Sequence, residues 1–262
     1  MAVLTHNLWC HYPMTYLKQH DHVLPGFATD QRLRAFAHHV VNEQYDIVCV
    51  QEVFVWRLGC MVGDNNFVAL RGFMMRAGLV YHSTPSAAGV CGQNSGVAVF
   101  SRHPLARCQC YRFEHSAEWA NRKGFVVADA QLGSRIIRVV SAHLDARDWV
   151  AKKTQLAQIA KRLDALEAQN PATSVLVCGD FNCCPQLQGS GGFDDGQQYA
   201  FMEKQFRSVG LTDLWSPDDS VPTEGGATLD HIFVDSDTQG RVRKKEVVAI
   251  RDSSSDLDVS DH

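Results

Sequence analysis

The chain has 262 residues, of which 45% are hydrophobic and 21% are charged, an ordinary composition for a globular protein with a large core. The net charge of −4 provides no long-range attraction for nucleic acid, although a local basic cleft is still possible. The N-terminal residues lack the pattern of a signal peptide, and no window approaches the roughly 18 apolar residues of a membrane span. We therefore expect a cytoplasmic protein, or one bound peripherally to the cytosolic face of a membrane.

The cysteines favour a reducing environment. There are nine of them, an odd number, and neither the pair Cys108 and Cys110 nor the adjacent pair Cys183 and Cys184 has the spacing of a zinc knuckle. Since Cys49 and Cys178 stand inside apolar runs, we expect buried, reduced thiols.

In the first half of the chain, strand-like and helical segments alternate. Apolar residues at helical spacing predict a helix over 30–43, with Thr29 as its N-cap. The other predicted elements are a strand over 2–9, a buried strand over 46–50 and a helix over 65–77.

The second half continues this alternation. Consecutive strands are predicted over 96–100, 106–113, 124–131 and 135–142, the last two joined by a tight turn at Gly133-Ser134. There follow a helix over 150–168, a strand over 174–178, a surface loop over 185–196, a helix over 199–209, and strands over 229–234 and 243–250. With no internal repeat or linker, we predict one α/β domain over 1–262, with two packed sheets and helices outside. Because the sequence stops directly after a candidate site residue, we expect the natural protein to continue.

Short polar motifs stand at the ends of the predicted strands, where distant residues can meet in one cleft. Glu52 leaves a buried strand as a carboxylate, which is costly to bury unless something neutralises it. A hard cation such as Mg²⁺ does so with oxygen ligands, and Asn7, at the end of the first strand, can supply another oxygen. Taken alone, Glu52 also fits a helix cap or a surface ion pair.

The motif Gly179-Asp180-Phe181-Asn182 follows another apolar run. Glycine permits a tight turn, so Asp180 and Asn182 can point to the same side. Asp180 could then hold an attacking water, and Asn182 could donate to a phosphate oxygen. The same tetrapeptide also fits an Asx turn.

Two histidines in such motifs are candidates for proton transfer near neutral pH. His143 ends a strand-like run, and His262 ends the motif Ser260-Asp261-His262. An aspartate such as Asp230, paired with a histidine ring, would fix the tautomer and stabilise the imidazolium. Because most of the 12 histidines must be structural or exposed, the prediction depends on all the motifs occurring together.

In this order, the motifs resemble those of the endonuclease/exonuclease/phosphatase superfamily of Mg²⁺-dependent phosphoesterases. The matching residues are Asn7, Glu52, His143, Asp180, Asn182, Asp230, Asp261 and His262. The resemblance covers nearly the whole chain and implies a four-layer α/β sandwich like that of DNase I. It also implies Mg²⁺, with Mn²⁺ as an alternative, bound by Glu52, Asn7 and Asp261, while the other five residues act in catalysis.

Longer stretches resemble neutral sphingomyelinases, namely 8–13, 32–34, 46–54, 95–105 and 143–146. Glu118 and Lys123 resemble an acidic residue and a lysine of that family, which usually has aspartate at the first position. The implied substrate is sphingomyelin or a related phosphosphingolipid at a membrane surface, cleaved to ceramide and a phosphorylated headgroup. Lys123, His143 and Asn182 would contact the phosphate or headgroup, and no nucleic acid is expected.

Other branches of the superfamily fit less well. Abasic-site endonucleases carry a tyrosine where this chain has His143, and inositol polyphosphate 5-phosphatases carry a Trp-Cys-Asp-Arg stretch that is absent here. Two alternatives stay open: a metal-dependent nuclease and a non-catalytic binding module. The apolar residues after Glu52 fit either a core or a membrane interface, namely Phe54, Val55, Trp56, Leu58 and Met61.

Overall fold

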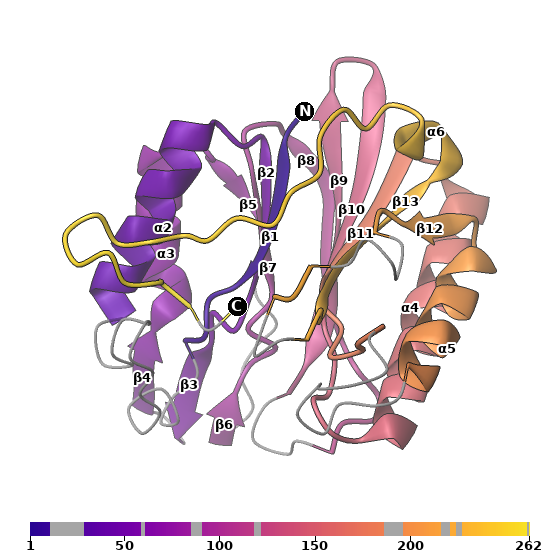
Figure 1. Ribbon diagram of the computed structural model, residues 1–262, viewed down its shortest axis with the longest axis horizontal. Helices are drawn as coiled ribbons and strands as arrows, with labels where there is room; N and C mark the ends of the chain where they lie inside the picture. The colour runs from indigo at the N-terminus through magenta and orange to yellow at the C-terminus, as the bar shows by residue number, and fades with distance from the viewer. Residues whose placement is uncertain are drawn as a thin grey trace.

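Two sheets form the centre of the molecule in the computed structural model, which describes residues 1–10, 29–58, 61–84, 91–117, 122–185, 196–215, 221–223, 227–260 and 262 (Figure 1). The first sheet has the strand order β1-β2-β7-β5, formed by β1 (Val3–Asn7), β2 (Ile47–Gln51), β7 (Ala98–Ser101) and β5 (Tyr81–His82). The second has the order β12-β13-β11-β10-β9-β8, formed by β12 (Leu211–Asp213), β13 (Asp230–Asp235), β11 (Ser174–Asp180), β10 (Arg135–His143), β9 (Gly124–Leu132) and β8 (Leu105–Arg112).

Helices cover the outer face of each sheet (Figure 1). The pair α2 (Thr29–Glu43) and α3 (Asn66–Arg76) covers the four-stranded sheet, whereas α4 (Trp149–Gln169) and α5 (Gln197–Arg207) cover the six-stranded sheet. A short helix, α6 (Ser236–Gln239), follows β13. The predicted four-layer α/β sandwich is confirmed, because the layers stack in the order helices, sheet, sheet, helices.

Each interface between layers has its own apolar core. Phe36 of α2 and Phe100 of β7 belong to the first core, between the helices and the four-stranded sheet. Cys49 and Val139 belong to the second, between the sheets, and Leu163 belongs to the third, beneath α4 and α5. Strands with buried side chains on both faces are continuous apolar runs, which is why the sequence shows them clearly.

A smaller sheet continues from the end of β2. It consists of β4 (Met61–Asn65), β3 (Val55–Leu58) and β6 (Cys91–Gln93) in that order. The sequence did not predict these strands, nor β5 and β12, because each has five residues or fewer and no clear alternation.

The prediction of a strand over 243–250 is wrong. Its residues form an extended C-terminal segment (residues 242–260, followed by His262) that leaves α6, crosses to α2 and returns to the centre (Figure 1). Its single strand-like pairing in the described chain is an isolated bridge between Arg251 and Asp258. Ile250 and Val259 are buried in the core beneath α2, so the apolar pattern reflects packing across the layers rather than a sheet.

None of the described helices combines the length and apolarity that crossing a bilayer requires. Among the side chains that the structure describes, seven cysteines, including Cys49 and Cys178, have free thiols.

Candidate active site

Sheet register places three predicted site residues in one row. Asp180, the last residue of β11, pairs with His143 of β10 on one side and with Asp230 of β13 on the other. Gly179 makes this row possible, because a Cβ at this position would lie 2.0 Å from the carbonyl oxygen of Ala142. The glycine therefore permits the close approach of two strands. It also adopts a φ of +142°, which residues with a side chain rarely adopt.

The buried Asp180 carboxylate is the centre of the site. Its Oδ2 accepts a hydrogen bond of 3.0 Å from Asn7 Nδ2, and it lies 3.5 Å from His143 Nε2 and 3.7 Å from His262 Nε2. Its Oδ1 accepts from the backbone N–H of Asn182 at 2.9 Å. Burial raises the pKa of Asp180 to about 7, although His262 and Lys123 act in the opposite direction. The group can therefore change protonation near neutral pH.

His262 is oriented by Asp230. Its Nδ1 lies 2.8 Å from Asp230 Oδ2, and its Nε2 lies 3.2 Å from Asn7 Nδ2. Burial alone would raise the pKa of Asp230, but the charge and hydrogen bond of His262 bring it below the ordinary value. Since the charged carboxylate accepts a hydrogen bond from Nδ1–H, the lone pair of the neutral ring is on Nε2, which faces the cluster.

Asn7 joins the two ends of the described chain. The N–H of Trp9, whose φ is +50°, donates to Asn7 Oδ1 at 3.0 Å and so fixes the amide. The hydroxyl of Ser260 donates to the carbonyl oxygen of Asn7 at 2.6 Å. Asn7 and His262 are thereby held together across 255 positions of sequence.

Glu52 enters the site through a turn held by the motif Asn94-Ser95-Gly96. Asn94 Oδ1 accepts from the N–H groups of Val55 and Gly96, at 2.9 and 3.1 Å. A Cβ on Gly96 would meet the Phe54 ring at 2.6 Å, so glycine is required beside this turn. Glu52 itself has a φ of +59°, an uncommon conformation for a glutamate.

The Glu52 carboxylate fits a cation. Its Oε1 lies 3.8 Å from His143 Nε2, and its buried Oε2 has no hydrogen-bond partner among the described residues. An orphaned carboxylate oxygen is costly unless it binds a metal or a water. No three His, Cys, Asp or Glu side chains in the described ranges form a metal cluster, but Mg²⁺ commonly uses one or two carboxylates and several waters. The predicted ligand Asp261 lies outside the described residues, as does Glu118.

Two buried lysines hold the turns on the other side of Asp180. Lys123 Nζ lies 2.9 Å from His143 Nε2 and donates to the carbonyl oxygen of Leu144 at 2.8 Å. Asn182 Nδ2 donates to the same carbonyl at 3.1 Å, which leaves its second N–H for a ligand. Lys152 Nζ donates to the carbonyl oxygen of Asn182 at 2.6 Å.

Sequence reasoning missed Lys152, although a signal was present. Lys152 precedes Leu156 and Ile159 at helical spacing, so it stands on the apolar stripe of α4. A lysine on such a stripe indicates a buried acceptor.

A neighbouring histidine has a structural role instead. His231 Nδ1 lies 2.9 Å from Asp213 Oδ2, and its Nε2 lies 2.8 Å from the carbonyl oxygen of Cys183. Burial would lower the pKa of His231, but the pairing with Asp213 raises it above the ordinary value.

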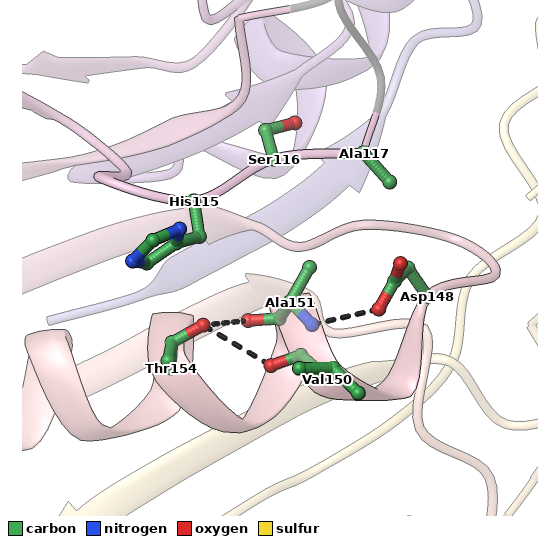
Figure 2. Close-up of a pocket in the computed structure, with 7 residues that line it drawn as sticks. All are labelled: His115, Ser116, Ala117, Asp148, Val150, Ala151 and Thr154. Atoms are coloured by element: carbon green, nitrogen blue, oxygen red, sulfur yellow. Dashed lines mark hydrogen bonds between the residues drawn. The ribbon is translucent and has the colours of Figure 1, made fainter.

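A pocket of about 310 Å³ lies between segment 115–117 and the first turns of α4, where Asp148 caps the helix by accepting from Ala151 N–H at 2.8 Å (Figure 2). The pocket is lined by His115, Ser116, Ala117, Asp148, Val150, Ala151 and Thr154. None of the predicted site residues that the structure describes lines it, so this pocket is separate from the Asp180 cluster.

The profile of the Endonuclease/Exonuclease/phosphatase family matches residues 4–262. The chain belongs to this family. A search of curated protein sequences found no match.

Solved structures similar to this family member include sphingomyelinase C from Streptomyces griseocarneus, with 20% identity, a TM-score of 0.67, and coverage of 99% of this chain and 96% of that chain. A β-hairpin deletion mutant of beta toxin from Staphylococcus aureus has 16% identity, a TM-score of 0.66, and coverage of 94% and 89%. TDP2 from C. elegans has 17% identity, a TM-score of 0.54, and coverage of 80% and 60%. Another beta toxin structure holds magnesium ions. At these identities the similarity shows a shared fold.

Proposed function

We propose that this protein is a Mg²⁺-dependent phosphodiesterase that hydrolyses sphingomyelin or a related phosphosphingolipid to ceramide and a phosphorylated headgroup. The observation that carries the proposal is the convergence of Asn7, His143 and His262 on the buried Asp180 carboxylate, with Glu52 beside His143. The lipid substrate is supported by the sequence resemblance and by the similarity in fold to sphingomyelinase C.

In this proposal, His262 is the general base. Its Nε2 takes a proton from water while Asp230 holds the ring and stabilises the imidazolium that forms. Asp180, 3.7 Å from that nitrogen, aligns the water. The water oxygen forms a bond to phosphorus as the bond to the ceramide oxygen breaks. The leaving oxygen takes up a proton from solvent water, and the His262 imidazolium later returns its proton to the solvent.

Glu52 and Asn7 would hold the cation, with Asp261 as a further ligand. When bound, Mg²⁺ or Mn²⁺ supplies positive charge at the phosphate and at the leaving oxygen. The unpartnered Oε2 of Glu52 supports this assignment.

Lys123, His143 and Asn182 would stabilise the charge that develops on the phosphate. Lys123 Nζ lies 2.9 Å from His143 Nε2, so the two side chains hold one another in place beside Asp180. The Leu144 carbonyl holds Lys123 and Asn182, and Lys152 holds the backbone of Asn182. Donors that are held in place before the reaction stabilise developing charge effectively, because they do not reorganise during it.

A lipid substrate requires contact with a membrane surface. Phe54 is buried against Gly96 and Val55 packs against the core beneath α2, so neither is available for insertion. Trp56 of β3 is half-buried and is our candidate for the interface, whereas the side chains of Leu58 and Met61 lie outside the described ones.

The test uses mixed vesicles of sphingomyelin and phosphatidylcholine with Mg²⁺, with product analysis for ceramide and diacylglycerol. We expect ceramide, and we expect EDTA to abolish its release. Glu52→Gln should lower turnover by about 10²-fold or more, because it removes the charge that neutralises the cation. Nicking of plasmid DNA with intact lipids would instead indicate a nuclease, and inactivity toward lipids, DNA and bis-p-nitrophenyl phosphate would indicate a binding module.

A further inference from the structure

Arg32 is a fully buried arginine that contacts two segments of the site from beneath. From its place on α2, its Nε donates to the carbonyl oxygen of Val259 at 2.7 Å. Its Nη1 donates to the carbonyl oxygen of Trp9 at 3.2 Å, and its Nη2 donates to that of Leu8. The guanidinium also stacks 5.0 Å from the Trp9 ring.

These contacts belong to the two segments that carry Asn7 and His262. Leu8 and Trp9 directly follow Asn7, and Val259 precedes Ser260, whose hydroxyl bonds to Asn7. One rigid guanidinium therefore fixes the turn after β1 and the end of the C-terminal segment at the same time. Lysine cannot replace it, because an ammonium is a point donor on a flexible stem.

Another buried arginine shows what a purely structural contact looks like. Arg138 is also fully buried, but it pairs with Asp129 at 2.8 Å and with Glu167, away from the predicted site residues. The ion pairs of the described residues include none for Arg32, whose acceptors are backbone carbonyls. Arg32 thus orients the backbone carbonyls of Leu8, Trp9 and Val259 rather than neutralising a carboxylate.

We infer that Arg32 is a positioning residue that sets the placement of His262 relative to Asn7 and Asp180. This inference rests on the proposed function, because it assigns a purpose to the same site. A shift of about 1 Å in such a group can lower turnover by about 10²-fold.

The test compares Arg32→Lys with the matched variant Arg138→Lys, on bis-p-nitrophenyl phosphate with Mg²⁺. We expect Arg32→Lys to lower kcat by about 10- to 100-fold while KM stays within about 2-fold. Arg138→Lys should lower the melting temperature and leave kcat unchanged. A folded Arg32→Lys protein with the kcat of the unmodified protein overturns the inference.

A second readout does not depend on activity. With ¹⁵N-labelled histidine, the His262 ring signals, assigned from His262→Gln, should shift in Arg32→Lys and stay in place in Arg138→Lys. If the unmodified protein is inactive but these signals shift, the proposed function fails and the positioning role stands. If Arg32→Lys does not fold, Trp9→Leu removes the stacked ring and keeps all the carbonyls, and it should still shift the His262 signals; unchanged signals in that variant contradict the inference.

Discussion

His262 lies beside two aspartates whose environments push their pKa values apart. Asp230 is paired with the ring and stays charged, whereas burial raises the pKa of Asp180 to about 7. Such a divergence is how one fold separates an anchoring carboxylate from one that changes protonation during a reaction. Asp230 therefore suits orientation of the base, and Asp180 suits contact with water.

Removal of the base or of its anchor should abolish most of the activity. We expect His262→Ala to lower kcat by about 10²- to 10⁴-fold, and Asp230→Asn to lower it as well because the ring loses its fixed tautomer. His38→Ala is the control, since His38 is exposed and bonds only to Asn42 within the described chain. Hydrolysis of vesicle sphingomyelin is the measurement, and a folded His262→Ala protein at full rate would contradict the assignment.

The His231–Asp213 pair should make stability depend on pH. Because the pKa of His231 in the folded protein is above its ordinary value of 6.5, the pair stabilises fully below that pH and loses its contribution as the pH rises through the raised pKa. Asp180 adds a slope of the same sign, so the comparison must be with Asp213→Asn. Urea unfolding at pH 6 and pH 9 should show a smaller decrease for Asp213→Asn than for the unmodified protein, and equal decreases would refute the prediction.

At the scale of elements, the register of β10, β11 and β13 determines which side chains meet. A slip of one residue would turn Asp180 away from the cluster, so the core between the sheets and the site depend on the same pairing. Gly179 is the point where this register is most constrained, because the backbone of Ala142 occupies the space of a Cβ.

Gly179→Ala should therefore cost at least about 3 kcal/mol of folding free energy, since a backbone atom must move. Gly133→Ala is the matched control. Gly133 also has a positive φ, of +63°, but nothing lies within 4 Å of its Cβ position, so only the conformational cost of about 1 kcal/mol applies. Denaturant unfolding measures both, and similar losses for the two variants would contradict the register argument.

Sequence patterns predicted the long elements well and the short ones poorly. Elements with buried apolar runs, such as β11 and α4, are found within a few residues of their predicted bounds, because burial on regular faces leaves a periodic signal. The segment over 243–250 misled the prediction, because Ile250 is buried by packing across layers rather than by sheet pairing.

The polar motifs at strand ends indicated the residues that converge, but not the ones that hold them. Asn7, Glu52 and Asp180 stand out as polar residues after apolar runs. Arg32 and Lys152 stand out less, because each is one of several charges on its helix and its backbone acceptors are supplied by tertiary contacts; the signal for Lys152 is its place on the apolar stripe of α4. The sequence does not show which backbone carbonyls will lie next to a given side chain.

At the scale of the molecule, the site lies where the two sheets meet. β1 contributes Asn7 from one sheet, β11 contributes Asp180 from the other, and the C-terminal segment brings His262 between them. The strands of both sheets end before this segment begins, at Asp235. His262, the base of the proposed mechanism, is thus added to a scaffold that other residues build.

A chain shortened after Asp258 should keep both sheets and lose activity. It retains every strand but lacks His262, and it loses the buried Val259 from the core beneath α2. We expect a native-like circular dichroism spectrum, a lower melting temperature and no ceramide release. Substantial ceramide release by the shortened chain would show that the base lies elsewhere.

The separation of Asn7 from His262 has a consequence for how the protein is made. A contact between positions so far apart cannot form until the whole intervening chain has been made. During synthesis, Asn7, Glu52 and Asp180 are all made before His262. Under the proposed function, the chain therefore stays inactive until the segment that carries His262 has been synthesised and has reached Asn7.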